Sequence, residues 1–169
     1  VLGTPFGQIV YTGDFKFDQT AEKNYRTDIA RLVEIGQGKV LALLADAAGT
    51  EGDTDSVNES KISDYILETF RDNKKKRIII AAVASNIQRI QQVIDATVAT
   101  KRKLVLSGND IENVVRTAIR LRKLYLPVPE SKLLVNLKNA KNLAASETVI
   151  LETGRMGEPI KHLNRMANG

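Results

Sequence analysis

The sequence predicts an α/β protein of three layers, in which helices cover both faces of a mostly parallel sheet and a short β segment precedes that sheet. Two observations carry this prediction. Strand-like and helix-like apolar patterns alternate about every 25–30 residues between Val40 and Gly169. The strand-like runs are also continuously apolar, which is typical of parallel strands buried on both faces.

The N-terminal residues predict a separate β segment. Residues 8–12 have a strand pattern, and the Gly- and Pro-containing residues 3–7 indicate a turn before it. Val1 and Leu2 then form the end of a hairpin partner. The chain opens inside this β pattern without a methionine and ends at Gly169 as a helix C-cap would. We therefore expect the sequence to be a piece of a longer protein.

Five short apolar runs predict the strands of the main sheet, and helical patterns lie between them. The runs occupy residues 40–45, 78–84, 104–106, 133–135 and 149–151. Two helices open with a capping box, a Ser followed three residues later by Glu or Gln, at Ser56 and Ser85. The others are residues 110–124, residues 140–145, and a last helix from Pro159 to Ala167.

The composition excludes several kinds of site. The sequence has no cysteine, which excludes a disulfide scaffold, a thiolate zinc site, an iron–sulfur cluster and a cysteine nucleophile. Its single histidine, His162, cannot complete a site that needs two imidazoles, and we expect a surface or packing role for it. The sequence shows neither an apolar run of ~20 residues nor a secretion leader, so we expect a cytoplasmic protein with no membrane partner.

The net charge is moderately positive, because 25 Lys and Arg stand against 20 Asp and Glu, a formal charge of +5. Residues 74–77 and 101–103 are basic runs before predicted strands, where a solvated turn is expected. Arg116, Arg120 and Lys123 recur at helical spacing and would share one helix face. This stripe is a candidate contact for phosphates, although a solvated helix face has the same pattern.

Two aspartates follow predicted strands at their carboxyl ends, which is where parallel sheets bind ligands. Asp14 comes directly after Gly13, whose missing Cβ allows a backbone and a metal to approach closely. Asp46 follows the apolar run that begins at Val40. Both are candidate metal or catalytic residues, and both positions are also usual for turn residues or helix caps.

Small and polar residues follow the other predicted strands. Backbone N–H groups in such loops can bind a phosphate, and the same residue types also build ordinary tight turns. The candidates are Ser85 and Asn86, Ser107 and Gly108, and Gly154, Gly157 and Glu158.

Four segments together resemble the ribonuclease J family, of the β-CASP branch of the metallo-β-lactamase superfamily. Residues 9–18 (IVYTGDFKFD) resemble its fourth metallo-β-lactamase motif, and residues 43–47 (LLADA) resemble its first β-CASP motif. Residues 84–96 (ASNIQRIQQVIDA) resemble its ASN-x-x-R-x-Q-Q-x-x-D helix start, and residues 152–159 (ETGRMGEP) its TG-x-x-GEP block. Their order and spacing agree over nearly the whole chain.

The resemblance implies two domains: the end of a metallo-β-lactamase domain over residues 1–38 and a β-CASP domain over residues 39–169. It implies cleavage of RNA, internally and from the 5′ end, by two divalent metal ions, zinc or manganese, that activate water. In this interpretation Asp14 bridges the metals, and Asp46 lies beside them and assists positioning or proton transfer. The loops that start at Ser85 and Ser107 border the channel for the RNA 5′ end.

The family's metal-binding histidines have no counterparts among these residues, so we expect this fragment alone to be inactive and to hold no metal tightly. Ala47 and Ala48 stand where the family has Ser and Thr, and Asn109 stands where it has Arg. Three interpretations remain open: part of a metal-dependent ribonuclease, a non-catalytic RNA-binding or assembly subunit of a degenerate paralogue, and a doubly wound nucleotide-binding domain. A homo-oligomer or an assembly with a paralogous subunit is expected.

Overall fold

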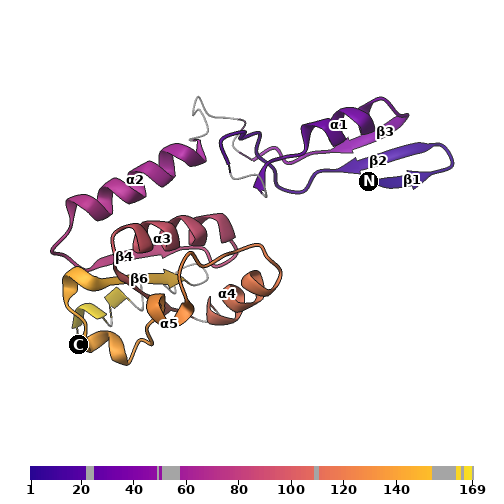
Figure 1. Cartoon of the computed structure of the whole chain (residues 1–169). Coiled ribbons are helices and arrows are strands. Elements are labelled where there is room, and N and C mark those ends of the chain that lie inside the picture. The colour runs from indigo at the N-terminus through magenta and orange to yellow at the C-terminus, as the bar shows by residue number, and fades with distance from the viewer. Residues whose placement is uncertain are drawn as a thin grey trace. The chain divides into compact units, whose positions relative to one another are not determined.

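The computed structural model describes residues 1–21, 25–48, 50, 58–108, 111–153, 163–164 and 166–168. The chain divides into two compact units, Val1–Lys61 and Ile62–Gly169. Within the described residues each unit contains its own three-stranded sheet (Figure 1). The α/β class predicted from the sequence is therefore confirmed, with the strands divided between two sheets.

The first unit is a β-hairpin extended by a parallel strand. Its elements are β1 (Leu2–Thr4), β2 (Gly7–Tyr11), α1 (Ile29–Gly36) and β3 (Val40–Leu44). β1 pairs antiparallel with β2, as predicted, and β3 pairs parallel with β2. The Asp28 carboxylate caps α1 by accepting a hydrogen bond of 2.9 Å from the Arg31 N–H. α1 thus makes the crossover that two parallel strands require.

The environment of β3 differs from the prediction that residues 40–45 form a central strand buried on both faces. Val40, Leu41, Leu43 and Leu44 are 38–64% exposed. β3 is the last strand in the order β1-β2-β3, with β2 as its neighbour among the described residues. The prediction is wrong for the described chain because an apolar run reports how hydrophobic a strand is, not which segments cover it.

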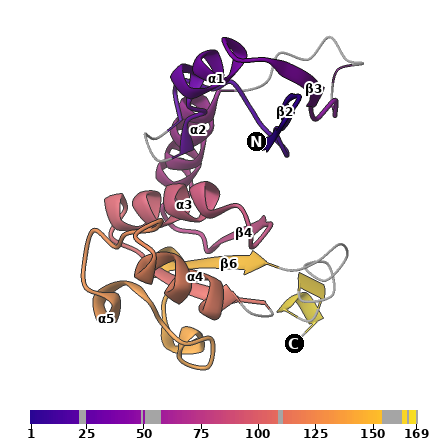
Figure 2. The ribbon, with the colours of Figure 1, turned by 90° about the vertical axis from the view of Figure 1, so that its right-hand side faces the viewer.

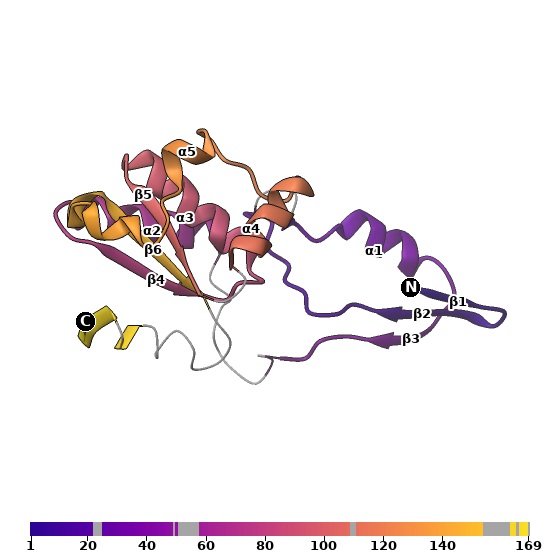
Figure 3. The ribbon, with the colours of Figure 1, turned by 90° about the horizontal axis from the view of Figure 1, so that it is seen from below.

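The second unit is a parallel sheet with helices. Its elements are α2 (Glu59–Asp72), whose first three residues belong to the first unit, β4 (Ile78–Ala82), α3 (Ile87–Ala99), β5 (Lys103–Ser107), α4 (Ile111–Arg120), α5 (Glu130–Leu133), the 3₁₀ turns η2 (Asn139–Asn142) and η3 (Ala145–Glu147), and β6 (Thr148–Thr153). The strand order is β4-β6-β5, and both pairings are parallel (Figure 3). β6, the last strand in sequence, is thus the central strand of the sheet.

Alternate residues of β5 and β6 face two apolar clusters. Leu104 and Leu151 are completely buried in the larger cluster, which includes residues of α2, α3 and α4; Figure 2 shows α3 beside β4 and β6. Val105 and Ile150 face a smaller cluster with Ala140, which lies in η2. Both sheet faces are therefore covered, one by helices and the other by a segment with a 3₁₀ turn.

The third predicted helix, residues 110–124, ends earlier than expected, because α4 stops at Arg120. Arg122 has a left-handed φ of 55°, and the Lys123 N–H donates to the Ala118 carbonyl at 2.8 Å. α3 ends in the same way, with Lys101 at φ 57°. These are Schellman endings, in which glycine is the usual left-handed residue. Since neither helix has that glycine, the sequence pattern did not reveal where they stop.

Two further predictions in this unit are wrong. The strand expected at residues 133–135 is the end of α5 followed by an isolated bridge between Leu104 and Leu134. The helix expected at residues 140–145 is replaced by two separate 3₁₀ turns. Short apolar runs do not distinguish these alternatives.

The helix starts also differ in detail from the predicted capping boxes. α3 is capped by Asn86 and not by Ser85. The Asn86 side-chain oxygen accepts a hydrogen bond of 2.9 Å from the Arg89 N–H. At α2 the Glu59 N–H donates to Asp18 at 2.7 Å, a partner that is distant in sequence. Ser56, the expected cap, lies outside the described residues, as does Pro159, the expected start of the last helix.

The compact units meet between Lys61 and Ile62, whereas the sequence placed a domain boundary between residues 38 and 39. β3 accordingly belongs to the first unit and not to the second sheet. The assignment of residues 1–38 and 39–169 to two domains of the family stays a prediction.

A buried arginine just before β5 forms hydrogen bonds with the backbone that follows α2. Arg102 is 5% exposed, and its guanidinium donates to the carbonyls of Asn73 and Lys76, each at 2.8 Å. Its carbon Cζ also lies 5.9 Å from the centre of the Phe70 ring. Burial lowers the pKa of this guanidinium, but an arginine stays charged in proteins. A cation thus satisfies carbonyls that follow a helix C-terminus, where positive charge is favourable.

Replacing Arg102 with Met removes these donors while it keeps most of the buried volume. We expect the free energy of unfolding to fall by about 2–4 kcal/mol, because two partly buried hydrogen bonds from a charged donor are lost. Urea unfolding of the chain, followed by circular dichroism, measures the change. The matched control, Lys75→Met, removes one exposed cation and should stay within about 0.5 kcal/mol of the wild type. A loss no larger than that of the control contradicts the role given to Arg102.

Candidate functional site

The first sheet brings the two candidate aspartates to one edge. β2 and β3 are parallel, and their last pair is Tyr11 with Leu44. The pairing continues beyond the strands: the Thr12 N–H donates to the Leu44 carbonyl at 3.0 Å, and the Asp46 N–H approaches the Thr12 hydroxyl at 3.3 Å. Asp14 and Asp46 therefore both follow strands at their carboxyl ends, as the sequence predicted, and the structure shows that these two strands are neighbours.

The two aspartates differ in local environment. Asp14 is exposed, and Asp46 is partly buried. One carboxylate oxygen of Asp46 accepts from the Ala48 N–H at 2.9 Å, which is an Asx turn. The turn role considered for Asp46 is thus present in the structure.

A third aspartate, Asp18, anchors the loop that contains Asp14. One carboxylate oxygen accepts from the Thr20 N–H at 2.8 Å and from the Thr20 hydroxyl at 2.6 Å. The other accepts from the Glu59 N–H at 2.7 Å. The Lys16 ammonium lies 3.6 Å from both the Asp18 and the Glu59 carboxylates. The loop after β2 is thereby fixed to the first turn of α2.

These contacts favour the ionised form of Asp18. The hydrogen bonds from Thr20 and from the Glu59 backbone, followed by the Lys16 charge, lower its pKa from 3.8 to about 2, against a smaller opposing effect of burial. Sequence reasoning missed this role, because a contact between positions 18 and 59 leaves no local pattern. The Asp18 carboxylate therefore acts as a long-range cap of α2.

The two candidate aspartates do not belong to a larger cluster of metal-ligating side chains among the described residues. Asp14 and Asp46 offer carboxylate oxygens of the kind that divalent cations bind. Among the residues that the structure describes, no group of three or more His, Cys, Asp and Glu side chains is close enough together to hold a metal ion. A zinc ion alone takes three or four protein ligands, so these residues do not complete the site that the family resemblance implies.

Some of the candidate phosphate-binding residues follow the carboxyl ends of strands in the second sheet. β4, β5 and β6 run in one direction, so their carboxyl ends lie at one edge of the sheet. Ser85 and Asn86 follow β4 and are exposed, whereas Ser107 ends β5 and is 6% exposed. Gly154, Gly157 and Glu158, together with His162, lie outside the described residues. Roles in binding phosphate remain predictions for all of these residues.

Gly108 allows the ends of β5 and β6 to lie against each other. Its φ is +120°, and a Cβ placed there would stand 1.9 Å from the Thr153 carbonyl oxygen. Thr153 itself is completely buried. The glycine is therefore required by backbone packing at this edge, independently of any phosphate.

The helix-start motif at residues 84–96 has a structural explanation. Asn86 caps α3 with its side-chain oxygen. The Gln91 amide pairs with the backbone of Tyr125, accepting from its N–H at 3.0 Å and donating to its carbonyl at 3.1 Å, and it also donates to Asp95 at 2.9 Å. Burial raises the pKa of Asp95, partly opposed by this amide. The motif thus ties α3 to the segment after α4.

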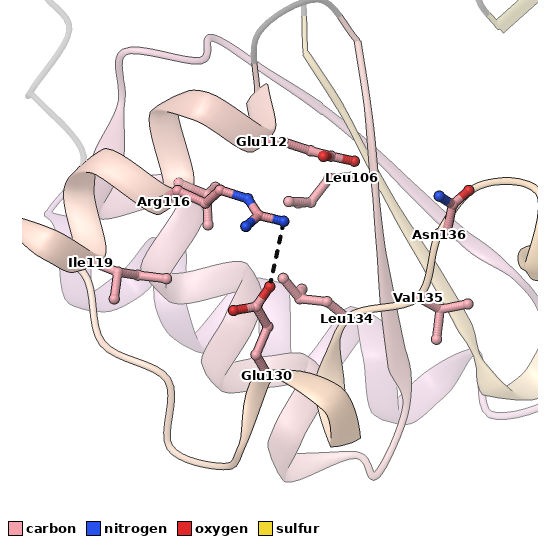
Figure 4. A pocket seen from close by; sticks show the side chains of 9 residues that line it. Leu106, Glu112, Arg116, Ile119, Glu130, Leu134, Val135 and Asn136 are labelled. Carbon is pink, nitrogen blue, oxygen red and sulfur yellow. Dashed lines mark ion pairs between the residues drawn. The ribbon is translucent and has the colours of Figure 1, made fainter.

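The predicted basic stripe is not continuous in the structure. Arg116 and Arg120 are exposed on α4, but Lys123 lies beyond the end of the helix. Figure 4 shows Arg116 and Glu130 pointing toward each other, with 3.9 Å between the charged atoms. Both side chains are more than half exposed, so this ion pair contributes little to stability. The prediction that Lys123 shares a helix face with the two arginines is wrong.

A pocket of about 200 Å³ lies between α4, α5 and β5. Its walls are apolar, with a charged rim that includes Arg116 and Glu130, and it is lined by Leu106, Glu112, Val115, Arg116, Ile119, Glu130, Leu134, Val135 and Asn136. Sites for small ligands usually measure about 300–1,000 Å³. The pocket is therefore small for a nucleotide.

In both sheets, candidate site residues follow the carboxyl ends of parallel strands. This is the usual position of ligand sites in α/β proteins, the class to which the fold belongs. Comparison with known proteins is more specific. Residues 75–169 match the family described as Ribonuclease J, beta-CASP domain. The chain belongs to this family, as its motifs indicated.

The relatives that cover the whole chain bear related names. The chain is 48% identical over its full length to Ribonuclease J 2 of Streptococcus pyogenes serotype M3, and covers 30% of that protein. It is 40% identical over 98% of its length to Ribonuclease J2 of Bacillus subtilis, and 35% identical over 98% to Ribonuclease J 2 of Staphylococcus epidermidis, covering 29% of each. The chain thus spans less than a third of the length of these curated relatives.

None of the helices in the described residues has the length and apolar character of a membrane span.

Exchanging Asp18 for Asn should alter how stability depends on pH. Because the folded pKa of Asp18 is about 2 and its ordinary value is 3.8, its ionic contribution is complete above about pH 4 and disappears as the pH falls toward 2. The wild type should exceed Asp18→Asn in free energy of unfolding most at neutral pH, with the difference shrinking below about pH 4. Urea unfolding at several pH values measures this. Asp64→Asn, which changes an exposed carboxylate on α2, is the matched control and should stay within about 0.5 kcal/mol of the wild type at neutral pH.

Adding a methyl group at Gly108 tests the backbone contact with Thr153. Gly108→Ala should lower the free energy of unfolding by more than about 2 kcal/mol, because it combines an unfavourable φ with a clash against a carbonyl. Thermal and urea unfolding provide the measurement. Gly36→Ala serves as the control, since a Cβ at the end of α1 meets nothing within 4 Å. Equal stability of the two variants would show that the backbone near Thr153 can shift to accept a Cβ, and would contradict the requirement for glycine at position 108.

Proposed function

We propose that the full-length protein is a metal-dependent ribonuclease that hydrolyses RNA phosphodiesters, internally and from the 5′ end. The observation that carries the proposal is the position of Asp14 and Asp46 beyond the same edge of the first sheet, in a chain of the ribonuclease J family. Carboxylates at the ends of parallel strands are suited to bind divalent cations. The second unit then supplies the surface that receives RNA.

In this proposal Asp14 is a ligand shared by two divalent ions, zinc or manganese, and Asp46 assists positioning or proton transfer. The ions would supply activation of water and stabilisation of charge on the phosphate. Asp18 would keep the Asp14 loop in place through its bonds to Thr20 and to the first turn of α2. The remaining ligands would come from residues beyond this chain, which spans about 30% of its relatives.

RNA is the proposed substrate, and the residues after β4, β5 and β6 are the proposed contacts of its 5′ end. Ser85, Ser107 and Gly108 follow strands that end at one edge, which supports this assignment. Arg116 and Arg120 are proposed as further phosphate contacts, with Glu130 as a competitor for Arg116. We also propose a cytoplasmic protein that assembles with itself or with a paralogous subunit.

A non-catalytic role as an RNA-binding or assembly subunit is the second candidate. Ala47 and Ala48 favour it, because they follow Asp46 at positions where the family has hydroxyl side chains. In the structure the Ala48 N–H donates to the Asp46 carboxylate, so this turn forms without hydroxyls. The absence of a hydroxyl beside Asp46 thus leaves the turn intact but removes a side chain that could orient the Asp46 carboxylate.

Asp14→Ala in the full-length protein tests the proposal. We expect cleavage of a 5′-monophosphorylated RNA in the presence of manganese to fall by at least about 100-fold, because a shared metal ligand is lost. RNA binding measured in the same samples should persist. Initial rates of product formation on gels give the comparison.

Asp64→Asn is the matched control, since it removes an exposed carboxylate from α2 and should leave the rate unchanged. Equal activity of Asp14→Ala and this control would reject the role of Asp14. A wild-type protein that binds RNA but does not cleave it with either metal would favour the second candidate.

A further inference from the structure

We propose that a basic surface at the amino edge of the second sheet binds the phosphate backbone of RNA, at a distance from the strand ends that the proposed function uses. We call it the amino-edge patch, and define it as Lys74, Lys75, Lys76, Arg77 and Lys101. This inference rests on the proposed function, because it takes RNA as the polyanion that the protein meets.

Arg102 brings the two basic runs of the patch together. Its guanidinium donates to the carbonyl of Lys76 at 2.8 Å, across 26 positions of sequence. A second bond of 2.8 Å reaches the carbonyl of Asn73, just before the first run. Because Lys101 is its chain neighbour, the turn after α2 and the turn after α3 lie side by side. The sequence alone presented these runs as unrelated solvated turns.

The strand order supports the same placement. The first run precedes β4 and the second precedes β5, and these strands flank β6 on either side. Two strand spacings separate their starts, about 10 Å. Figure 1 shows the connection from α2 to β4 at the side of the sheet where β6 begins.

The patch is exposed and carries an unusual share of the charge. All five of its residues are exposed. The second unit has 19 Lys and Arg against 10 Asp and Glu, a net charge of +9. Residues 72–77, 101–103 and 145–147, which reach this edge, have seven cations against two carboxylates and so contribute +5 from 12 of 108 residues. The positive charge is therefore concentrated at the amino edge.

Lys101 contributes its charge to the patch from an unusual backbone conformation, which Arg122 shares at the end of α4. It is the left-handed residue of the ending of α3, with φ 57°. An L-residue in that conformation costs about 1 kcal/mol, which glycine at the same position would avoid. The chain thus keeps a long cationic side chain where local stability favours glycine, and places it in the patch.

The composition of the patch fits a phosphate backbone better than a base-reading site. Lysine offers a mobile point charge to phosphate, whereas recognition of unpaired bases relies on aromatic stacking. Phe70, the aromatic ring that Arg102 contacts, is 1% exposed and cannot stack on a base. The five-residue strands put the patch about 16 Å from the carboxyl edge. A long RNA can therefore reach both edges, and a very short RNA cannot.

The test uses the full-length protein with Lys74, Lys75, Lys76 and Lys101 all changed to Gln. Arg102 is retained because it supports the fold. Affinity is measured by fluorescence anisotropy for 5′-monophosphorylated single-stranded RNAs of about 2 and about 40 nucleotides over a range of salt concentrations. The control variant has four other exposed lysines changed to Gln, namely Lys39, Lys61, Lys138 and Lys141.

We expect the patch variant to bind the long RNA at least about 10-fold more weakly near 0.1 M salt, with the slope of log affinity against log salt reduced by about 0.7 for each lost phosphate contact. Binding and cleavage of the short RNA should stay within about 2-fold of wild type, and the control variant should keep the wild-type slope for both RNAs.

Two results overturn the inference: unchanged binding of the long RNA, or an equal loss in the control variant. In each of these, cleavage of the short RNA by the wild type leaves the proposed function standing. If the wild-type protein binds neither RNA, the proposed function itself fails.

Discussion

The parallel pairing of β6 between β4 and β5 is the constraint on which the second unit depends. It inserts the last strand of the chain between two earlier ones, so β4 and β5 are held at a fixed spacing. The carboxyl ends then meet at one edge, where Gly108 lies against Thr153 with no room for a Cβ. The amino ends meet at the other edge, where Arg102 closes the space between two turns. One ladder thus creates two chemically different edges.

Several motif residues hold the fold instead of facing a ligand. Asn86 caps α3, and the buried Gln91 amide replaces a pair of backbone hydrogen bonds opposite Tyr125. Asp18 caps α2 in a similar way, although it lies 41 positions before Glu59, whose N–H it binds. These side chains satisfy backbone groups, so a motif can reflect the requirements of the fold as well as those of a ligand.

Much of the architecture could be predicted from local sequence, because strands β2, β4 and β6 and helices α2 and α3 have clear apolar patterns. The contacts that fix the candidate sites could not, since they join distant positions: Asp18 with Glu59, and Arg102 with Lys76. The helix ends at Lys101 and Arg122 were hidden because each has a cation where glycine is usual. The exposure of β3 was missed because hydrophobicity does not identify the covering segment.

The two units have net charges of opposite sign. The first has 10 Asp and Glu against 6 Lys and Arg, a charge of −4, and the second has +9. The unit that contains Asp14 and Asp46 thus attracts cations and repels a polyanion, whereas the second does the reverse. If the proposed divalent cations bind the first unit, they would weaken that repulsion, and the binding of cations and of a polyanion would then be thermodynamically linked. By reciprocity, a bound polyanion would tighten the hold of the first unit on its cations.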